Sequence, residues 1–295
     1  MKELTIVGVL LEHKPYYQAR LCRFDLSDPV ADLKEKAKAI WALGSYIDIA
    51  TFLSPMSAHL VRAAGVSRGE HVLDVACGTG ITAITACRAG AKVTGIDLTP
   101  ELLERAKEEA ALAGITEGIE WKHGDAEDLP FPDNSFDIVF SSLGHMFTPR
   151  PEVAAKELIR VTKEGGCIAF TTWPPEHNVG RFFAAIVKHV PPPAGSPPSP
   201  MQWGIPQIVQ ERLGSNVKDL HFERGAVYFP VLSPNHFWQL FSTKYGPLIR
   251  AIQALGGQGS SKVEALEHDF IQAVTPYMHE NLIRQDYLLT LALKA

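Results

Sequence analysis

A short glycine-rich run in the first third of the chain has the residue types of a nucleotide-binding loop. It reads Ala76, Cys77, Gly78, Thr79 and Gly80, and it lies between an apolar segment and a predicted helix. Small residues at such a turn let backbone N–H groups approach a ligand closely, and the N-terminus of the following helix adds its dipole. Alone the run is ambiguous, because Gly78-x-Gly80-x-x-Ala83 also satisfies the relaxed dinucleotide fingerprint of an oxidoreductase.

Three carboxylates stand at the ends of successive predicted strands near this loop. Asp74 ends the first strand, Asp97 ends the second, and Asp125 follows the third. A carboxylate beside the loop repels a pyrophosphate and attracts a cation, so Asp74 argues against a dinucleotide. Asp97 is suited to bind both hydroxyls of a ribose. Together the three acids favour a nucleoside that carries a positive charge, and the sulfonium S-adenosylmethionine is such a ligand.

Strands and helices must alternate to bring these acids to one edge of a sheet. Predicted strands cover 71–76, 91–97, 119–123, 136–141 and 167–173, with predicted helices at 81–89, 101–113 and 152–162. Two later strands are predicted at 226–232 and 286–293. Alternation of this kind produces a parallel sheet with right-handed crossovers. The expected fold is α/β, a doubly wound, Rossmann-like, mostly parallel seven-stranded sheet with helices on both faces.

Two divergent parts flank this core. Residues 1–65 are expected to form an N-terminal extension with lid helices and a β-hairpin within 5–24, and residues 66–175 form the cofactor-binding core. Residues 176–295 hold the last two core strands and an inserted helical cap over the active site. Within them, the proline-rich stretch 191–200 is incompatible with regular structure and predicts a loop or lid.

Five runs of the core carry motifs that resemble those of class I methyltransferases. They are 72–80 (VLDVACGTG), 93–97 (VTGID), 124–131 (GDAEDLPF), 135–137 (SFD) and 157–166 (ELIRVTKEGG). The resemblance covers residues 72–173, and it is greatest to the branch that includes the ubiquinone and menaquinone C-methyltransferases. It implies an S-adenosylmethionine-dependent methyltransferase whose cofactor product is S-adenosylhomocysteine.

The resemblance also implies roles for individual residues. Asp97 would hold the ribose hydroxyls, Asp125 and Ala126 would recognise the adenine edge, and the 76–80 loop would pass beneath the methionine part. The remaining cofactor-binding residues implied in the core are Leu98 and Glu127.

Three further positions are also assigned to the cofactor site. Tyr46 resembles a position where related enzymes close an N-terminal helix over the cofactor, and a packed helix aromatic is the alternative. Ser141, after the fourth predicted strand, is expected to border the cofactor. Ala76 stands where many relatives carry glycine, which is tolerable if its backbone angles are ordinary.

The methyl acceptor is expected at the segment after the fourth strand and beneath the cap. His145 is the best single candidate for a general base, because it can accept a proton near neutral pH; a substrate-orienting or packing role is the alternative. Trp173 walls the acceptor pocket, stacks on the sulfonium region or belongs to the core. Cap residues that offer aromatic or apolar surface for a hydrophobic or ring-containing acceptor are His236, Phe237, Trp238, Phe241, Tyr245, Tyr277 and Met278. Simple core packing is the alternative at each of them.

Composition narrows the partners. A formal net charge of -5 argues against binding to nucleic acid, which needs a concentrated basic surface. The four cysteines form no C-x-x-C pair, and we expect free thiols in a reducing cytoplasm. No apolar run predicts a membrane span, the histidines form no H-E-x-x-H arrangement, and no metal is expected. The expected partner is a small-molecule methyl acceptor, with a homodimer left open.

Two other functions remain open on the sequence. The first is a catalytically silent protein that binds S-adenosylmethionine for sensing or assembly. It would share the cofactor loop with an enzyme and differ at the acceptor pocket. The second is an NAD-dependent oxidoreductase, which would bind NAD and have no affinity for S-adenosylmethionine.

Overall fold

The computed structural model describes residues 29–295. The hairpin predicted within 5–24 lies outside the described residues. The strands are β1 (His71–Val75), β2 (Lys92–Asp97), β3 (Ile119–His123), β4 (Phe136–Ser142), β5 (Thr162–Thr172), β6 (Val217–Pro230), β7 (Met278–His279) and β8 (Leu282–Lys294). The longer helices are α1 (Pro29–Trp41), α3 (Ser54–Ala63), α4 (Ile81–Arg88), α5 (Pro100–Leu112), α6 (Pro151–Val161), α7 (Asn178–His189), α8 (Pro206–Leu213), α9 (Pro234–Lys244), α10 (Gly246–Ala254) and α11 (Ser261–Val274).

One sheet runs through the molecule, with strand order β3-β2-β1-β4-β5-β8-β6 and the short β7 paired to β8. Strands β1 to β5 are parallel, whereas β8 is antiparallel to both β5 and β6. The predicted mostly parallel, Rossmann-like sheet is therefore confirmed, with the two-residue β7 as an addition. In the centre, Val72 pairs with Val93 on one side and with Ile138 on the other. Such apolar runs form central strands because both faces of the sheet are covered.

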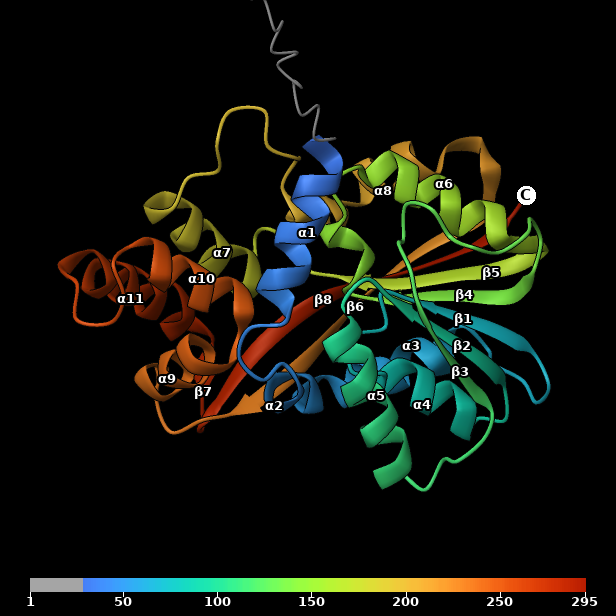
Figure 1. The fold of residues 1–295 in the computed structure, drawn as a ribbon, viewed down its shortest axis with the longest axis horizontal. Coiled ribbons are helices and arrows are strands. Elements are labelled where there is room, and N and C mark those ends of the chain that lie inside the picture. Colours follow the sequence, from blue (N-terminus) through green and yellow to red (C-terminus); the bar gives the residue numbers. More distant parts are fainter. Residues whose placement is uncertain (1–28) are drawn as a thin grey trace, which may run out of the picture.

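Helices cover the two faces of this sheet. In Figure 1, α3, α4 and α5 lie below the sheet, and α6 and α8 lie above it. Helix α5 begins where the sequence predicts, with Thr99 as N-cap residue and Pro100 in the first turn. Short connections between strand and helix place the ends of β1, β2 and β4 at one edge of the sheet.

Strands β6 and β8 are longer than the sequence indicates. Their antiparallel ladder joins Val217 with Lys294 at one end and Pro230 with Leu282 at the other. The ladder extends away from the core helices toward the cap (Figure 1). Much of β6 has exposed side chains, so its hydrophobic pattern is too weak to define its bounds in the sequence.

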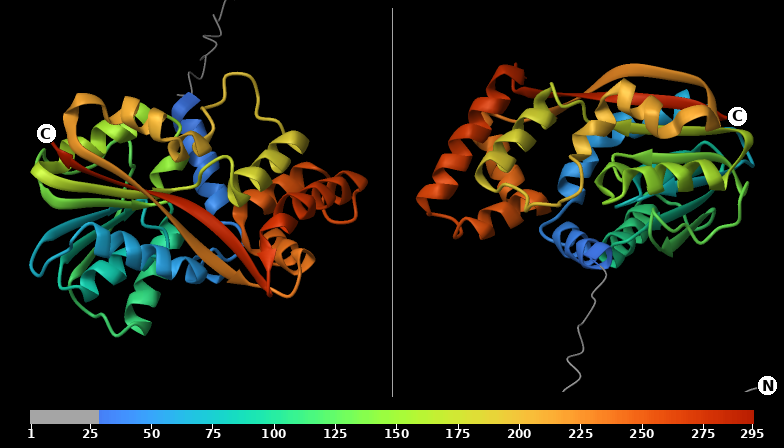
Figure 2. Two further views of the ribbon diagram at one scale, coloured as in Figure 1. Left: turned by 180° about the vertical axis from the view of Figure 1, so that it is seen from behind. Right: turned by 90° about the horizontal axis from the view of Figure 1, so that it is seen from above.

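Four helices, α7, α9, α10 and α11, form the cap at one end of the molecule (Figures 1 and 2). Phenylalanine side chains from three of them fill its interior: Phe182, Phe237, Phe241 and Phe270. Helix α1 lies between this cap and the core, and it contacts α10. The following short helix α2 (Ile47–Ala50) is joined to α9 by an ion pair between Asp48 and Lys244 at 2.7 Å.

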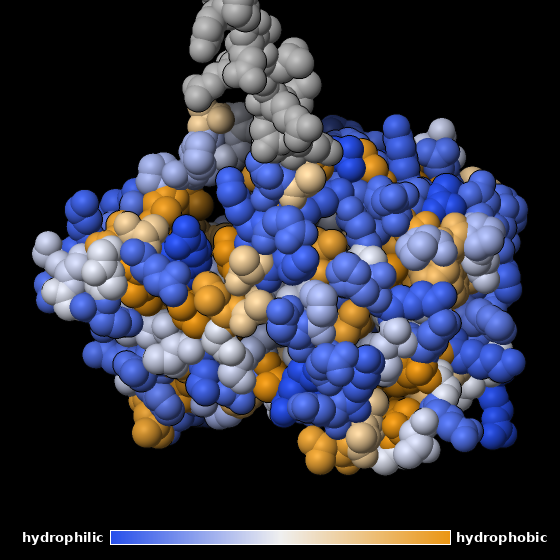
Figure 3. Space-filling view, in the orientation of Figure 1, coloured by the Kyte–Doolittle hydropathy of each residue, from blue (hydrophilic) through white to orange (hydrophobic). Residues whose placement is uncertain are grey.

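Hydrophilic residues cover most of the face in Figure 3, and apolar residues gather over the cap helices. Within residues 29–295, no helix combines the length and the apolar character that a membrane crossing requires.

Candidate active site

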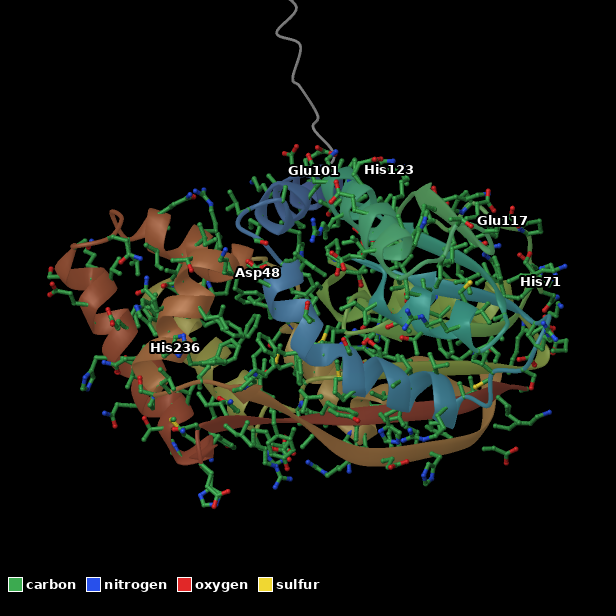
Figure 4. The ribbon with its side chains drawn as sticks, turned by 90° about the horizontal axis from the view of Figure 1, so that it is seen from below. Asp48, His71, Glu101, Glu117, His123 and His236 are labelled. Carbon is green, nitrogen blue, oxygen red and sulfur yellow. The ribbon has the colours of Figure 1, made fainter. Side chains whose placement is uncertain are left out.

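A cavity opens at the carboxyl ends of β1, β2 and β4, next to α1. Its empty volume is about 1080 Å³, including its open mouth, and we refer to it as the main cavity. Figure 4 shows His71, at the start of β1, and Glu117, before β3, at the far end of the sheet from the cap residue His236. In open α/β sheets, ligands bind outside the carboxyl ends of the strands, which is where this cavity lies.

The loop after β1 forms the floor of the main cavity, and its backbone is unusual. Ala76 has a φ of 53°, Gly78 a φ of 54°, and both line the cavity with Cys77. The condition under which alanine would be tolerated at position 76, ordinary backbone angles, is therefore not met. A left-handed conformation at a residue with a Cβ costs about 1–2 kcal/mol. This strain is the local consequence of alanine at a position where a left-handed turn favours glycine.

Asp97 fixes this loop to the end of β2. One carboxylate oxygen accepts a hydrogen bond from the Gly78 amide at 2.8 Å, and the other accepts one from the Thr99 amide at 2.8 Å. Burial raises the pKa of Asp97, and these two hydrogen bonds act in the opposite direction. The carboxylate lines the cavity, so it is placed as the sequence predicts for a ribose-binding acid.

Asp74, at the end of β1, is a buried carboxylate without a partner. It is 1% exposed, it lines the main cavity, and neither carboxylate oxygen has a hydrogen-bond partner among the described residues. Burial raises the pKa of Asp74 to about 8. The nearby backbone amide of Ala83 acts against this shift, and the charge of Asp97 adds to it. A cationic ligand beside this carboxyl group would favour its ionised form. It would replace the solvation energy that the carboxylate loses on burial.

Asp125, Ala126 and Leu98, which the sequence assigns to the cofactor site, also line the main cavity. One oxygen of Asp125 accepts a hydrogen bond from the Glu127 amide at 2.8 Å, and the other forms an ion pair with Lys34 of α1. The acid expected to recognise adenine is thus held in place by its own loop and by α1.

Helix α1 forms part of the cavity wall, which was not predicted from the sequence. Four of its residues line the main cavity: Lys34, Ala37, Lys38 and Trp41. Their spacing of three, four and seven residues is that of one helix face, and this spacing is the signal that could have found them. Lys34 also pairs with Glu127 at 2.7 Å, which ties the helix to the loop after β3.

Tyr46 lies where the main cavity continues toward the cap. Its ring packs edge-on against Trp41, with ring centroids 5.5 Å apart. Burial raises the pKa of Tyr46 to about 12, with a smaller contribution from the charge of Asp97. The phenol therefore keeps its proton at neutral pH and can act as a hydrogen-bond donor.

Three residues predicted for the cofactor site are used elsewhere. Gly80 does not line the cavity; a Cβ there would lie 2.5 Å from the Trp121 ring, so its glycine serves close packing. The Glu127 carboxylate is occupied by Arg150, whose Nε donates at 2.8 Å, and by Lys34. Ser141 donates to the Val75 carbonyl at 2.8 Å and is fully buried, and Ser142 lines the cavity instead. Successive side chains of a strand point to opposite faces, so a shift of one residue exchanges these roles.

His145 lines neither the main cavity nor the cavity next to it on the cap side. Its prediction as a general base is therefore wrong. Its ring is fully buried against Phe170 at 4.6 Å and Trp203 at 4.5 Å between ring centroids. Burial lowers the pKa of His145 to about 3, with a smaller contribution from the charge of Arg212. The imidazole is therefore neutral at pH 7 and packed within the core, the alternative that the sequence left open.

A second, narrower cavity adjoins the main cavity on the cap side, and its empty volume is about 370 Å³ including its open mouth. The two share wall residues Trp41, Tyr46, Leu53, Leu143 and Phe147. The remaining wall of the second cavity comes from α2, the end of β5, β6, β8 and the cap. It consists of Ile49, Trp173, Val179, Phe182, Phe229, Phe241, Tyr245 and Gln285. Trp173 thus walls the cavity, as one of its three predicted roles requires.

Of the cap residues predicted to face an acceptor, Phe241 and Tyr245 line the second cavity. Phe237 and Trp238 are buried in the packing of the cap, where both contact Phe270. The other three, His236, Tyr277 and Met278, do not line either cavity.

Comparisons with known proteins identify the class that this fold and site define. Residues 73–170 match a family model described as a methyltransferase domain. An uncharacterised protein of Mycobacterium tuberculosis is 37% identical over 260 residues, which cover 87% of this chain and 93% of that protein. The demethylmenaquinone methyltransferase of Staphylococcus aureus is 40% identical over 133 residues, 43% of this chain and 54% of that protein.

Solved structures agree on the fold. The YcgJ protein of Bacillus subtilis has a TM-score of 0.54 at 22% identity, over 81% of this chain and 98% of that one. The phosphoethanolamine N-methyltransferase 2 of Haemonchus contortus, solved with S-adenosylhomocysteine, has a TM-score of 0.52 at 18% identity, over 81% of this chain and 52% of that one. The chain therefore carries a methyltransferase domain with the fold of the class I S-adenosylmethionine-dependent enzymes. It belongs to the same family as the uncharacterised mycobacterial protein.

Proposed function

We propose that this chain transfers the methyl group of S-adenosylmethionine, bound in the main cavity, to a small hydrophobic or ring-containing acceptor bound in the second cavity. The observation that carries the proposal is the wall common to both cavities, which includes Tyr46, Leu143 and Phe147. In-line transfer requires the two ligands to meet, so the side chains of this shared wall would have to move apart when both ligands bind.

The residues of the main cavity fit this cofactor. Asp74 is a buried carboxylate without a partner, and a cationic ligand would satisfy it. Asp97 would bind the ribose hydroxyls, Asp125 and Ala126 the adenine edge, and the backbone at Cys77 and Gly78 the methionine part. When bound, S-adenosylmethionine supplies a methyl group that its sulfonium has already activated. A dinucleotide would gain little from Asp74, whose carboxyl group is mostly protonated at neutral pH when no cation lies beside it.

The second cavity supports an apolar acceptor. Its wall includes aromatic rings from the core and the cap, among them Trp173, Phe229 and Phe241. Among the described residues that line it, none is a carboxylate, an imidazole or an amine. These residues would therefore hold the acceptor in position and exclude water, and would not act as a general base. The protonated hydroxyl of Tyr46 can orient the acceptor at the junction of the two cavities.

The name of the staphylococcal relative, demethylmenaquinone methyltransferase, is compatible with a ring acceptor. That similarity extends over less than half of this chain. The proposed acceptor class therefore depends on the second cavity.

The experiment is an assay of S-adenosylhomocysteine release. The protein is incubated with S-adenosylmethionine and with fractions of an organic-solvent metabolite extract, with Asp97→Ala as the control. We expect release that depends on an apolar fraction and is lost in the variant. Binding of S-adenosylmethionine with no release from any fraction would contradict the enzyme and favour the silent binding protein. Binding of NAD in its place would favour the oxidoreductase.

A further inference from the structure

Gln285 is a polar residue on a strand face that is otherwise apolar. Side chains alternate along β8, so Gln285 shares its face with Ile283 and Tyr287, and all three are at most 3% exposed. Across the ladder it pairs with Val227, which is 1% exposed. An aliphatic side chain would satisfy this position as a core residue, so packing alone does not explain the amide.

Gln285 lines the second cavity, and its amide Nε2 is buried without a hydrogen-bond partner among the described residues. A buried donor without a partner costs about 1–3 kcal/mol, and natural cores seldom retain such a group without a use for it. A ligand atom in the cavity would complete it. The side chain is 2% exposed, so bulk water is not the partner.

The other residues with polar side-chain groups that line the second cavity are Tyr46 and Tyr245, through their hydroxyls, and Trp41 and Trp173, through their indole N–H groups. Burial raises the pKa of both phenols, that of Tyr245 well above its usual value, so neither carries charge at neutral pH. The described lining of the cavity is therefore uncharged, and a carboxylate or phosphate in it would lose its hydration without a counter-ion.

We propose that Gln285 is the specificity-determining residue for the acceptor, and that its amide binds the hydroxyl or carbonyl oxygen of a neutral aromatic ring. This inference rests on the proposed function, because it assigns the second cavity to the acceptor. The aromatic walls hold the ring, Gln285 holds its oxygen, and Tyr46 lies at the junction with the main cavity. The ring is thereby fixed at two points, which orients the atom that accepts the methyl group.

A hydrogen bond of this kind discriminates strongly. A pocket that recognises a ligand only by its apolar surface distinguishes one methylene by about 10–200-fold. A pocket built around a buried polar group rejects an analogue that lacks the partner atom by up to about 10⁴–10⁵-fold, because the protein group is then left unpaired. We expect a smaller factor for a simple probe, since it does not fill the cavity as the natural acceptor does.

The test is calorimetric titration with 2-naphthol and with naphthalene in the presence of S-adenosylhomocysteine, on wild type, Gln285→Leu and Gln285→Met. We expect wild type to bind 2-naphthol about tenfold more tightly than naphthalene, and both variants to lose this preference while they keep S-adenosylhomocysteine affinity. Two variants are used because either replacement alone could disturb the packing of β8.

Thr290→Val is the matched control. Thr290 lies on the same strand, is fully buried, and also has an unpartnered hydroxyl, but it lines neither cavity. Removing it should leave the preference for 2-naphthol unchanged. An unchanged preference in both Gln285 variants, or no preference in wild type, would overturn the inference. Because the titration needs no turnover, a preference lost only in the Gln285 variants supports it even if the proposed methyl transfer fails.

Discussion

The carboxylate of Asp97 accepts a hydrogen bond from the backbone amide of Gly78 at 2.8 Å, and this contact joins the end of β2 to the loop after β1. The same residue therefore shapes the loop and lines the main cavity. A change at Asp97 should affect the cofactor through both.

We predict that Asp97→Ala weakens S-adenosylmethionine binding by about 100-fold or more, since hydrogen bonds to a charged group contribute about 1.5–3 kcal/mol each. Asp97→Asn keeps one acceptor oxygen for a backbone amide and should lose less affinity. Equilibrium titration measures both, with thermal unfolding to establish that the variants are folded. Equal affinity in Asp97→Ala and wild type would exclude the assigned role.

Asp74 gives a prediction with opposite effects on stability and binding. Its pKa is about 8 in the folded chain, well above the ordinary value near 4, so the folded state binds more protons and stability falls as pH rises between these values. Asp74→Asn should raise the unfolding free energy of the ligand-free protein at pH 8 by at least about 1 kcal/mol, the equivalent of one pKa unit. The same variant should bind S-adenosylmethionine more weakly.

Denaturant unfolding at pH 5 and pH 8 measures the stability part of this prediction, because the gain over wild type should shrink at the lower pH. A variant that loses stability at pH 8, or binds the cofactor more tightly, would show that Asp74 is not an unpaired buried carboxylate.

Ala76→Gly should stabilise the chain. The substitution relieves about 1–2 kcal/mol of left-handed strain at φ 53°. Against this gain, glycine costs about 0.5–1 kcal/mol because it has more conformational entropy to lose on folding. The net expectation is a gain of about 0.5–1 kcal/mol. Ala76→Val provides the opposite case, since a β-branched residue tolerates this region less well. Chemical denaturation of the three proteins should rank glycine first and valine last.

His145 should contribute to packing and not to proton transfer. His145→Phe should keep turnover within about threefold of wild type, whereas His145→Ala should lose about 2–4 kcal/mol of stability through the space it leaves. Its folded pKa of about 3 lies below the ordinary value near 6.5, so the unfolded state binds more protons between them and stability falls as pH drops through this window.

His145→Phe removes this dependence. Relative to wild type, it should gain up to about 1.4 kcal/mol for each pH unit below 6.5. Unfolding at pH 4.5 and pH 7 measures the difference, and a large loss of turnover in a folded His145→Phe protein would restore the base assignment.

The core and its acids could be predicted from the sequence because the signals are local. Apolar strands that end at Asp74 and Asp97, each followed by a helix, leave few arrangements for a parallel sheet. Those acids and Asp125 therefore lie together at the carboxyl edge, as expected.

The rest of the site depends on contacts between distant parts of the chain. His145 is held in the core by Trp203, and the Glu127 carboxylate is held by Lys34 and Arg150. Gln285 was not predicted as a site residue. The strand predicted from the sequence begins at residue 286, just after Gln285, whereas β8 begins at Leu282. Pairing with β6, and not the hydrophobicity of β8 alone, sets that start.

Calorimetric titration of S-adenosylmethionine, and separately of NAD, into wild type and Asp97→Ala tests the central assignment most directly. The account predicts saturable binding of S-adenosylmethionine to wild type, at least about 100-fold weaker binding to the variant, and no binding of NAD. Saturable binding of NAD together with no heat from S-adenosylmethionine would contradict it.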